Sequence, residues 1–233
     1  MSVSYSDLYP ERRGHEVDPT ILQKATGAGH PKALKTTCER DVTYNIENMP
    51  MVQHMMSALD RAGCPVDLSR HLSCEMCQHG SGIEHAGGYD PALNQLFVCA
   101  NNATSIGYVH GALVRNLIQM FDVCVNKYNH QSAEHLACTE VRKANLANCG
   151  YLVHMQQRWA SIGWKKAHAD CVKNTAVDYL VKTKFVKEDI AKAAVNKVFD
   201  KCYNDLEPIG RRSMDADDIK RANNEKYLFG YHK

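Results

Sequence analysis

Two features are missing from this sequence: a long apolar run and a large excess of charge of one sign. No stretch approaches the ~18 consecutive apolar residues of a membrane-spanning helix, so nothing in the chain should cross a bilayer by itself. Peripheral contact with a membrane protein stays open. The 28 basic and 26 acidic residues give a formal net charge of +2. That balance argues against a dedicated nucleic-acid surface, which normally needs a basic patch. We therefore expect no nucleic-acid partner.

The first residues lack the usual features of cleavable targeting segments. A mitochondrial transit peptide is rich in arginine and poor in acidic residues, and a secretory signal has an apolar core. This segment has no apolar core, and it carries the acidic residues Asp7, Glu11, Glu16 and Asp18. The sequence therefore predicts no cleavable address.

Common catalytic and cofactor-binding motifs are also missing. The chain contains no G-x-S-x-G nucleophile turn, no glycine loop followed by Lys-Ser/Thr and no dinucleotide fingerprint. Each of these motifs supplies a backbone conformation that exposes a nucleophile or surrounds a phosphate. We therefore expect no cofactor and no small-molecule substrate.

Cysteine, by contrast, is abundant. The chain has ten cysteines: Cys38, Cys64, Cys74, Cys77, Cys99, Cys124, Cys138, Cys149, Cys171 and Cys202. A high and even count indicates either five disulfides or metal sites. A zinc site could start from Cys74-Glu-Met-Cys77, but it needs a second close pair, and the other cysteines are scattered. The spacing from Cys64 to Cys74 resembles that of proteins oxidised in the mitochondrial intermembrane space. Disulfides are therefore the favoured interpretation, and cysteines held in disulfides cannot act as nucleophiles.

The first hundred residues predict a mixture of arm, helix, loop and strand. Prolines and glycines in the polar segment 1–35 indicate an extended arm. Methionines and aliphatic residues recur at helical spacing over 47–62, and this stripe should face a core. Turn-forming residues over 63–90 indicate loops, and Gln95–Cys99 is a short strand candidate.

The sequence beyond 105 predicts helices. Val109, Leu113, Leu117, Phe121 and Cys124 form one apolar stripe. Arg115 and Gln119 lie about 200° around the helix from Leu113 and Leu117, respectively. That position suits either residues that face a cleft or an ordinary solvated face, and periodicity does not decide between them. Further helices are expected at 133–147, 150–162, 165–183 and 187–204.

The helices at 165–183 and 187–204 suggest one specific disulfide. Cys171 and Cys202 lie at comparable distances from the turn near Lys184 that connects the two helices. We therefore predict that these cysteines form the best pair, closing a loop of about 30 residues that stabilises the fold by roughly 3–4 kcal/mol.

The segment from Arg115 to Cys124, RNLIQMFDVC, resembles the active-site helix of a zinc protease with its chemical residues replaced. Such a helix carries H-E-x-x-H, in which two histidines bind Zn²⁺ and the glutamate acts as general base. Arg115 and Gln119 occupy the histidine positions, and Asn116 occupies the glutamate position. Arginine repels a cation, asparagine cannot act as a base and glutamine is a poor zinc ligand.

Landmarks on both sides support this alignment. They include Arg70-His-Leu-Ser-Cys-Glu-Met-Cys77, Gly87-Gly-Tyr-Asp90, Val98-Cys-Ala-Asn-Asn102, His135-Leu-Ala-Cys-Thr-Glu-Val-Arg142 and Glu207-Pro-Ile-Gly-Arg211. From about Cys38 to Arg211 the chain resembles one family, the mitochondrial intermembrane-space metalloproteases that mature a subunit of ATP synthase and help to assemble its membrane sector. Animal members are also described as Ku-binding proteins.

The resemblance implies a location in the intermembrane space, peripheral to the inner membrane, and a largely disulfide-bonded cysteine set. It also implies that the family's H-E-L-I-H helix begins at Arg115. Glu140, in the downstream motif, would be a third ligand or a neighbour of the ligands. The nearby His110 is followed by Gly111, so it does not start a shifted motif, and His135 should be a packed or hydrogen-bonded residue. One carboxylate does not make a zinc site, so we expect no metal and no catalytic residue.

We therefore expect an α+β fold that is predominantly helical, resembling a minimal zincin with a short sheet and disulfide staples. The expected organisation is an N-terminal extension at 1–35, an inactive metalloprotease-like domain at 36–211 and a C-terminal extension at 212–233. Polar extensions suit a protein held in a larger assembly. The expected function is thus a structural subunit of an inner-membrane respiratory complex or of ATP synthase, with other subunits as its partners. A free assembly chaperone and a metalloprotease with an unusual ligand set are the alternatives.

Overall fold

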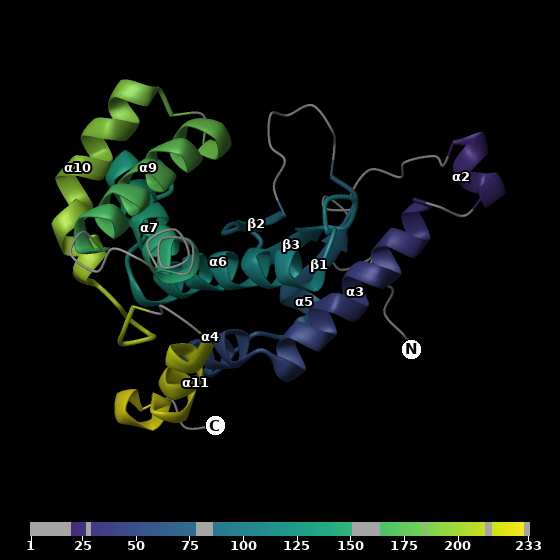
Figure 1. Cartoon of the computed structure of the whole chain (residues 1–233), viewed down its shortest axis with the longest axis horizontal. Coiled ribbons are helices and arrows are strands. Elements are labelled where there is room, and N and C mark those ends of the chain that lie inside the picture. Colours follow the sequence, from purple (N-terminus) through teal and green to yellow (C-terminus); the bar gives the residue numbers. More distant parts are fainter. Residues whose placement is uncertain are drawn as a thin grey trace.

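A computed structural model describes residues 20–26, 29–77, 86–150, 164–184, 186–212 and 216–230. Helices dominate the described residues, which also form one small sheet (Figure 1), and this confirms the predicted fold class. The elements are α2 (Ile21–Thr26), α3 (Pro31–Asn48), α4 (Pro50–Arg61), α5 (Leu68–His71), β1 (Leu72–Glu75), β2 (Gly87–Asp90), β3 (Gln95–Cys99), α6 (Ile106–Val125), α7 (Ala133–Lys143), the π-helix η2 (Ala144–Asn148), α9 (Trp164–Lys184), α10 (Glu188–Asn204), α11 (Ala216–Asn224) and the 3₁₀-helix η3 (Lys226–Phe229). The helix expected at 150–162 lies outside the described residues beyond its first position.

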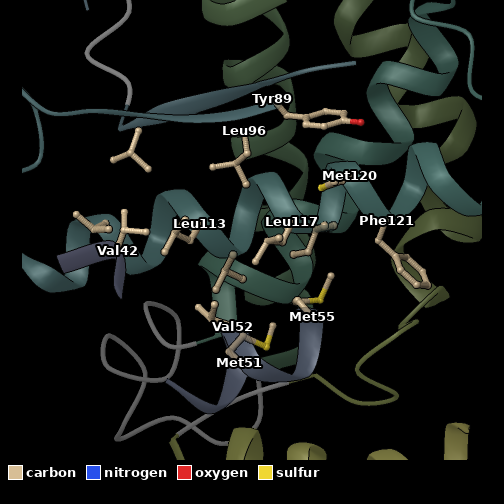
Figure 2. Close-up of a cluster of buried hydrophobic side chains, with 14 of the residues drawn as sticks. Val42, Met51, Val52, Met55, Tyr89, Leu96, Leu113, Leu117, Met120 and Phe121 are labelled. Atoms are coloured by element: carbon tan, nitrogen blue, oxygen red, sulfur yellow. The ribbon is translucent and has the colours of Figure 1, made fainter. Parts of the chain in front are cut away.

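Helix α6 is the central element of the larger hydrophobic core. Ser105 caps its first turn by accepting a hydrogen bond from the Tyr108 amide at 3.2 Å. Leu113 and Leu117 on α6 lie between the sheet and α4, and Met55 reaches them from the α4 side (Figure 2). The methionine stripe therefore faces the core, as predicted.

The three-stranded sheet has the order β1-β3-β2. Strand β1 is parallel to β3, and β2 is antiparallel to it. The prediction of loops over 63–90 is therefore wrong where α5, β1 and β2 form. The misleading signal was glycine. A Cβ atom on Gly87 would lie 2.1 Å from the carbonyl oxygen of Phe97, so β2 needs this glycine to approach β3 closely.

The described parts of both predicted extensions contain helices. Pro31 occupies the first turn of α3, where a missing N–H has no cost, so the helix starts within the segment that we expected to be extended. At the other end, α11 packs against α4, and Ile219 and Ala222 join the larger core. The described helix of the tail is therefore part of the folded unit.

All ten cysteines lie in the described residues and form five disulfides. The disulfides are Cys38–Cys74, Cys64–Cys124, Cys77–Cys99, Cys138–Cys202 and Cys149–Cys171. The first three join elements of the sheet half, which comprises α3 to α6, the sheet and α11. The last two join elements of the helical half, which comprises α7, η2, α9 and α10. The prediction that the cysteines form disulfides is confirmed.

The predicted pair of Cys171 with Cys202 is wrong. Helices α9 and α10 do pack together, but both also pack against the segment formed by α7 and η2. Cys202 bonds to Cys138 of α7, and Cys171 bonds to Cys149 at the end of η2. The prediction took only α9 and α10 into account, whereas their packing against α7 and η2 determines the pairing.

None of the described helices is both long and apolar enough to cross a membrane.

Candidate functional site

The polar face of α6 is buried, which answers the question that periodicity left open. Arg115 is 9% exposed, Asn116 5% and Gln119 3%. Helix α6 packs against α3, α4 and the sheet, and also against α7. This face lies inside the protein, so it is not a solvated face. A buried polar group is costly unless it finds a partner, so the partners of these side chains define the site.

Arg115 and Glu140 form the centre of the site. The Nη2 atom of Arg115 donates to Oε2 of Glu140 at 2.7 Å, and both side chains are buried. The Nη1 atom donates to Oδ1 of Asn148 at 2.5 Å. The guanidinium also lies 3.8 Å from the ring centroid of Tyr179 on α9. Three elements of the helical half therefore hold this one side chain of α6.

Lys143 completes the cluster, and the sequence analysis missed it. Its Nζ atom donates to Oε1 of Glu140 at 2.9 Å and to Oε1 of Gln119 at 2.5 Å. Lys143 follows Glu140 by three positions on α7, so the two side chains share a helix face. The spacing of three positions between Glu140 and Lys143 could have revealed this pair from the sequence. The contact with Gln119 depends on how α6 and α7 pack, which no local pattern reveals.

Asn116 takes a different role from its neighbours. Its Nδ2 atom donates to the carbonyl oxygen of Ala112 at 2.9 Å, one turn earlier in α6. This bond satisfies the buried amide within its own helix. The structure thus brings together Arg115, Gln119 and Glu140 of the predicted residues, and Asn116 stays apart from them.

The side chains of this cluster do not provide a ligand set that fits a zinc ion. Two cations, Arg115 and Lys143, flank the single carboxylate of Glu140. Zinc needs thiolate, imidazole or carboxylate ligands, usually at least three from the protein. Among the residues that the structure describes, no three His, Cys, Asp or Glu side chains gather where they could hold a metal ion. The site is therefore a buried ion-pair cluster.

A second buried ion pair lies further along the same two helices. Nε of Arg142 donates to Oδ1 of Asp122 at 2.9 Å, and the Thr139 hydroxyl donates to Oδ2 at 2.9 Å. Burial raises the pKa of Asp122 to about 6, and the contacts with Arg142 and Thr139 oppose this shift without cancelling it. Arg142 also donates to the backbone oxygens of Asp205 and Glu207. This pair therefore links α6 and α7 to the segment that follows α10.

The histidines near the site serve other purposes. Nδ1 of His135 accepts a hydrogen bond from the Asn129 amide at 2.9 Å, and its ring contacts Tyr128. His135 is thus a hydrogen-bonded residue at an exposed position, in agreement with the prediction of a packed or hydrogen-bonded histidine. Partial burial lowers the pKa of His110, and this residue belongs to no cluster of potential metal ligands among the described residues.

Comparison with known proteins identifies relatives over most of the chain. The model of the peptidase M76 family matches residues 36–210. A protein of Xenopus laevis is 32% identical over 92% of this chain and 88% of its own length. A human protein is 33% identical over 75% of this chain and 69% of its own length, and one of Danio rerio is 29% identical over 94% and 82%. All three are called mitochondrial inner membrane protease ATP23 homolog. No solved structure matches the chain.

These relatives test three expectations. The resemblance to the mitochondrial metalloprotease family is confirmed, and so is a mitochondrial location at the inner membrane. The expected function as an inactive structural subunit of a respiratory complex or ATP synthase is wrong, because the matching proteins are named as proteases rather than as subunits of such a complex. That expectation relied on the polar ends of the chain, and α11 at one of these ends packs within the fold itself.

Proposed function

Because the chain belongs to the peptidase M76 family, we propose that it is a member without proteolytic activity, which binds protein at the mitochondrial inner membrane and does not hydrolyse it. One observation carries this proposal. Arg115 and Gln119, which by the resemblance stand with Asn116 at the positions of the zinc ligands and general base, bind α7 through the buried cluster with Glu140 and Lys143.

Peptide hydrolysis by a zinc protease needs a metal-bound water and a base to deprotonate it. No side chain at these positions supplies either function. Arginine stays protonated in proteins and is only a donor, and the amide groups of asparagine and glutamine cannot take a proton at neutral pH. Within the described cluster, Glu140 is the one carboxylate that could bind a metal ion, and two cations already occupy its oxygens.

The cluster is also difficult to rearrange. Moving Arg115 out of the site would take its charge away from a buried carboxylate, and breaking such a pair costs about 3–5 kcal/mol. Nor would a side-chain rotation leave a suitable ligand set, because Lys143 would still face Gln119 and Glu140. The packing between α6 and α7 therefore supports the proposal that no metal ion is held here.

The rest of the fold supports a role in binding. Three disulfides lie within the sheet half and two within the helical half, and disulfides persist on the oxidising side of the inner membrane. Such a cross-linked framework can hold a binding surface in place without a catalytic site, which supports the proposal. We therefore infer that the partner is a protein, as for the relatives named as proteases.

The proposal is tested by proteolysis. The purified, oxidised protein is incubated with zinc and fluorescein-labelled casein, beside the human relative prepared in the same way. We expect no cleavage above a chelator-treated control, and binding of the intact polypeptide measured by anisotropy. Zinc-dependent cleavage by this chain would overturn the proposal, and the absence of any polypeptide binding would overturn its second part.

A restoring variant gives a sharper control. Arg115→His, Asn116→Glu and Gln119→His together reintroduce the family's motif, and Lys143→Ala removes the remaining cation. We expect zinc binding by this quadruple variant and none by the triple variant that keeps Lys143. If the quadruple variant binds no more zinc than the unaltered chain, the positions of the motif were assigned wrongly.

A further inference from the structure

The N-terminal part of the described chain forms an arm with exposed apolar side chains. Helix α2 lies beyond the end of α3, away from the rest of the molecule (Figure 1). Ile21 is 87% exposed and Leu22 is 72% exposed, which are the highest exposed fractions of any large hydrophobic residue that is described. We call Thr20–Thr26 together with Gly29–Lys35 the basic arm. Exposure of two adjacent large apolar residues at a projecting tip is unfavourable unless something covers them.

The charge of this arm is of one sign. It carries Lys24, Lys32 and Lys35, and the sequence from Thr20 to Thr37 contains no Asp or Glu. No ion pair joins any of the three lysines to another described residue. The next cation, Arg40, differs because it pairs with Asp41 at 2.8 Å. The described part of the arm has a charge of +3, and Glu16 and Asp18 precede it in the sequence.

We propose that the basic arm contacts the anionic surface of a lipid bilayer, with Ile21 and Leu22 entering the interface and the lysines facing the headgroups. An apolar tip beside cations that have no ion-pair partner among the described residues matches what such a surface offers, which is an apolar interior beneath a negative layer. Lysine suits this position, because its alkyl chain can lie along apolar surface while the ammonium group stays in water.

The shape of the arm favours a bilayer over a folded protein partner. Ile21 and Leu22 lie on a helix of six residues, and specific protein interfaces usually need about 800 Å² from each partner. Two side chains at the tip provide only a small part of that area. A bilayer requires no matching pocket, so charge complementarity and a small apolar tip are sufficient.

A second exposed apolar pair provides a comparison. Tyr227 is 58% and Leu228 66% exposed on η3. The segment Ala216–Gly230, which contains them, has no net charge, because its three basic residues are balanced by three acidic ones. The basic residues are Lys220, Arg221 and Lys226, and the acidic residues are Asp217, Asp218 and Glu225. Electrostatic attraction to anionic lipid is therefore expected at the basic arm and not at η3, and Tyr227 and Leu228 make a matched control.

The experiment measures binding of the full-length, oxidised protein to sedimented vesicles. One set contains phosphatidylcholine with about 30% phosphatidylglycerol, and the other contains phosphatidylcholine alone. We expect at least tenfold tighter binding to the anionic vesicles at about 0.1 M salt, and weaker binding as the salt concentration rises because exposed charges are screened. Equal binding to both kinds of vesicle, or none to either, would overturn the proposal.

Substitutions then locate the surface. Ile21→Ser with Leu22→Ser should lower the partition constant at least tenfold, and Lys24→Gln with Lys32→Gln and Lys35→Gln should lower it by roughly fivefold per lysine. Tyr227→Ser with Leu228→Ser should leave it unchanged. The altered residues are mostly exposed, so the midpoint of thermal unfolding of each variant should equal that of the unaltered protein. A lower midpoint would reveal a folding defect. If only the η3 variant loses binding, or if the arm variants change the oligomeric state instead, the proposal fails. The result is independent of the proposed lack of proteolysis.

Discussion

Arg115 and Glu140 are 25 positions apart in the chain, and their side chains meet at 2.7 Å in a buried ion pair between α6 and α7. This pair lies where the two disulfide-bonded halves of the molecule contact each other. No disulfide joins the sheet half to the helical half, and all ten cysteines are accounted for. Polar contacts between α6 and α7 therefore contribute to holding the halves together.

Replacing Arg115 should be costly for stability. Arg115→Met leaves Glu140 buried with Lys143 as its remaining partner among those described above, so we expect a loss of about 3 kcal/mol in the free energy of unfolding. The measurement is urea denaturation at neutral pH. Lys192→Met is the matched control, because Lys192 pairs with Glu188 on the surface, and such pairs contribute about 0–1 kcal/mol. Equal effects of the two substitutions would contradict this account of the cluster.

Asp122 should make stability depend on pH. Its folded-state pKa is raised to about 6, above the value of about 3.9 in an unfolded chain. The folded state therefore holds this proton more tightly. The resulting stabilisation is complete below about pH 4 and is lost as the pH rises through about 6, which amounts to up to about 3 kcal/mol.

The test compares the unaltered protein with Asp122→Asn by denaturation from pH 4 to pH 7. The stability of the unaltered protein minus that of the variant should fall over this range, because the variant cannot titrate at position 122. A difference that rises with pH would mean that Arg142 outweighs burial and lowers this pKa instead.

The disulfide connectivity is open to direct mapping. Mass spectrometry of the digested, unreduced protein should find one peptide pair with Cys138 and Cys202 and another with Cys149 and Cys171. The first closes a span of 64 positions, so its removal by Cys138→Ala with Cys202→Ala should cost about 4 kcal/mol on the chain-entropy model. Detection of Cys171 bonded to Cys202 would contradict the structure of the helical half.

Glycine at β2 should be essential for the sheet. Gly87→Ala places a Cβ atom 2.1 Å from the Phe97 carbonyl oxygen, so the backbone of β2 must shift, and we expect a loss of at least about 2 kcal/mol. Gly111→Ala is the control, because a Cβ atom there meets nothing within 4 Å. A helical alanine should add about 0.5–1 kcal/mol of stability. Thermal denaturation of both variants measures the contrast.

Features encoded by local patterns were predictable from the sequence. Strand β3 has the bounds that its β-branched and apolar residues indicate, and the methionines of α4 face the core. The predicted helices at 165–183 and 187–204 correspond to α9 and α10 within a few residues. These elements depend on periodicity and composition within one short segment.

Features that depend on packing between segments were not predictable in the same way. Gly87 and Gly88 indicated a turn, but their lack of a side chain serves the contact with β3. The partner of Cys171 depends on the packing of α9 against α7 and η2, which the sequence pattern of α9 and α10 does not reveal. Lys143 also escaped notice, because its contact with Gln119 joins two helices whose relative position no local pattern specifies.

The most direct test of the central claim is the zinc content of the purified, oxidised protein after equilibration with zinc and removal of loosely bound metal. The account predicts far less than one equivalent per chain, with no change in Arg115→Ala or Glu140→Gln, and about one equivalent in the human relative treated in parallel. One tightly bound equivalent that is lost on Glu140→Gln would contradict it, because the buried cluster of Arg115, Glu140 and Lys143 would then have to open to hold a metal ion.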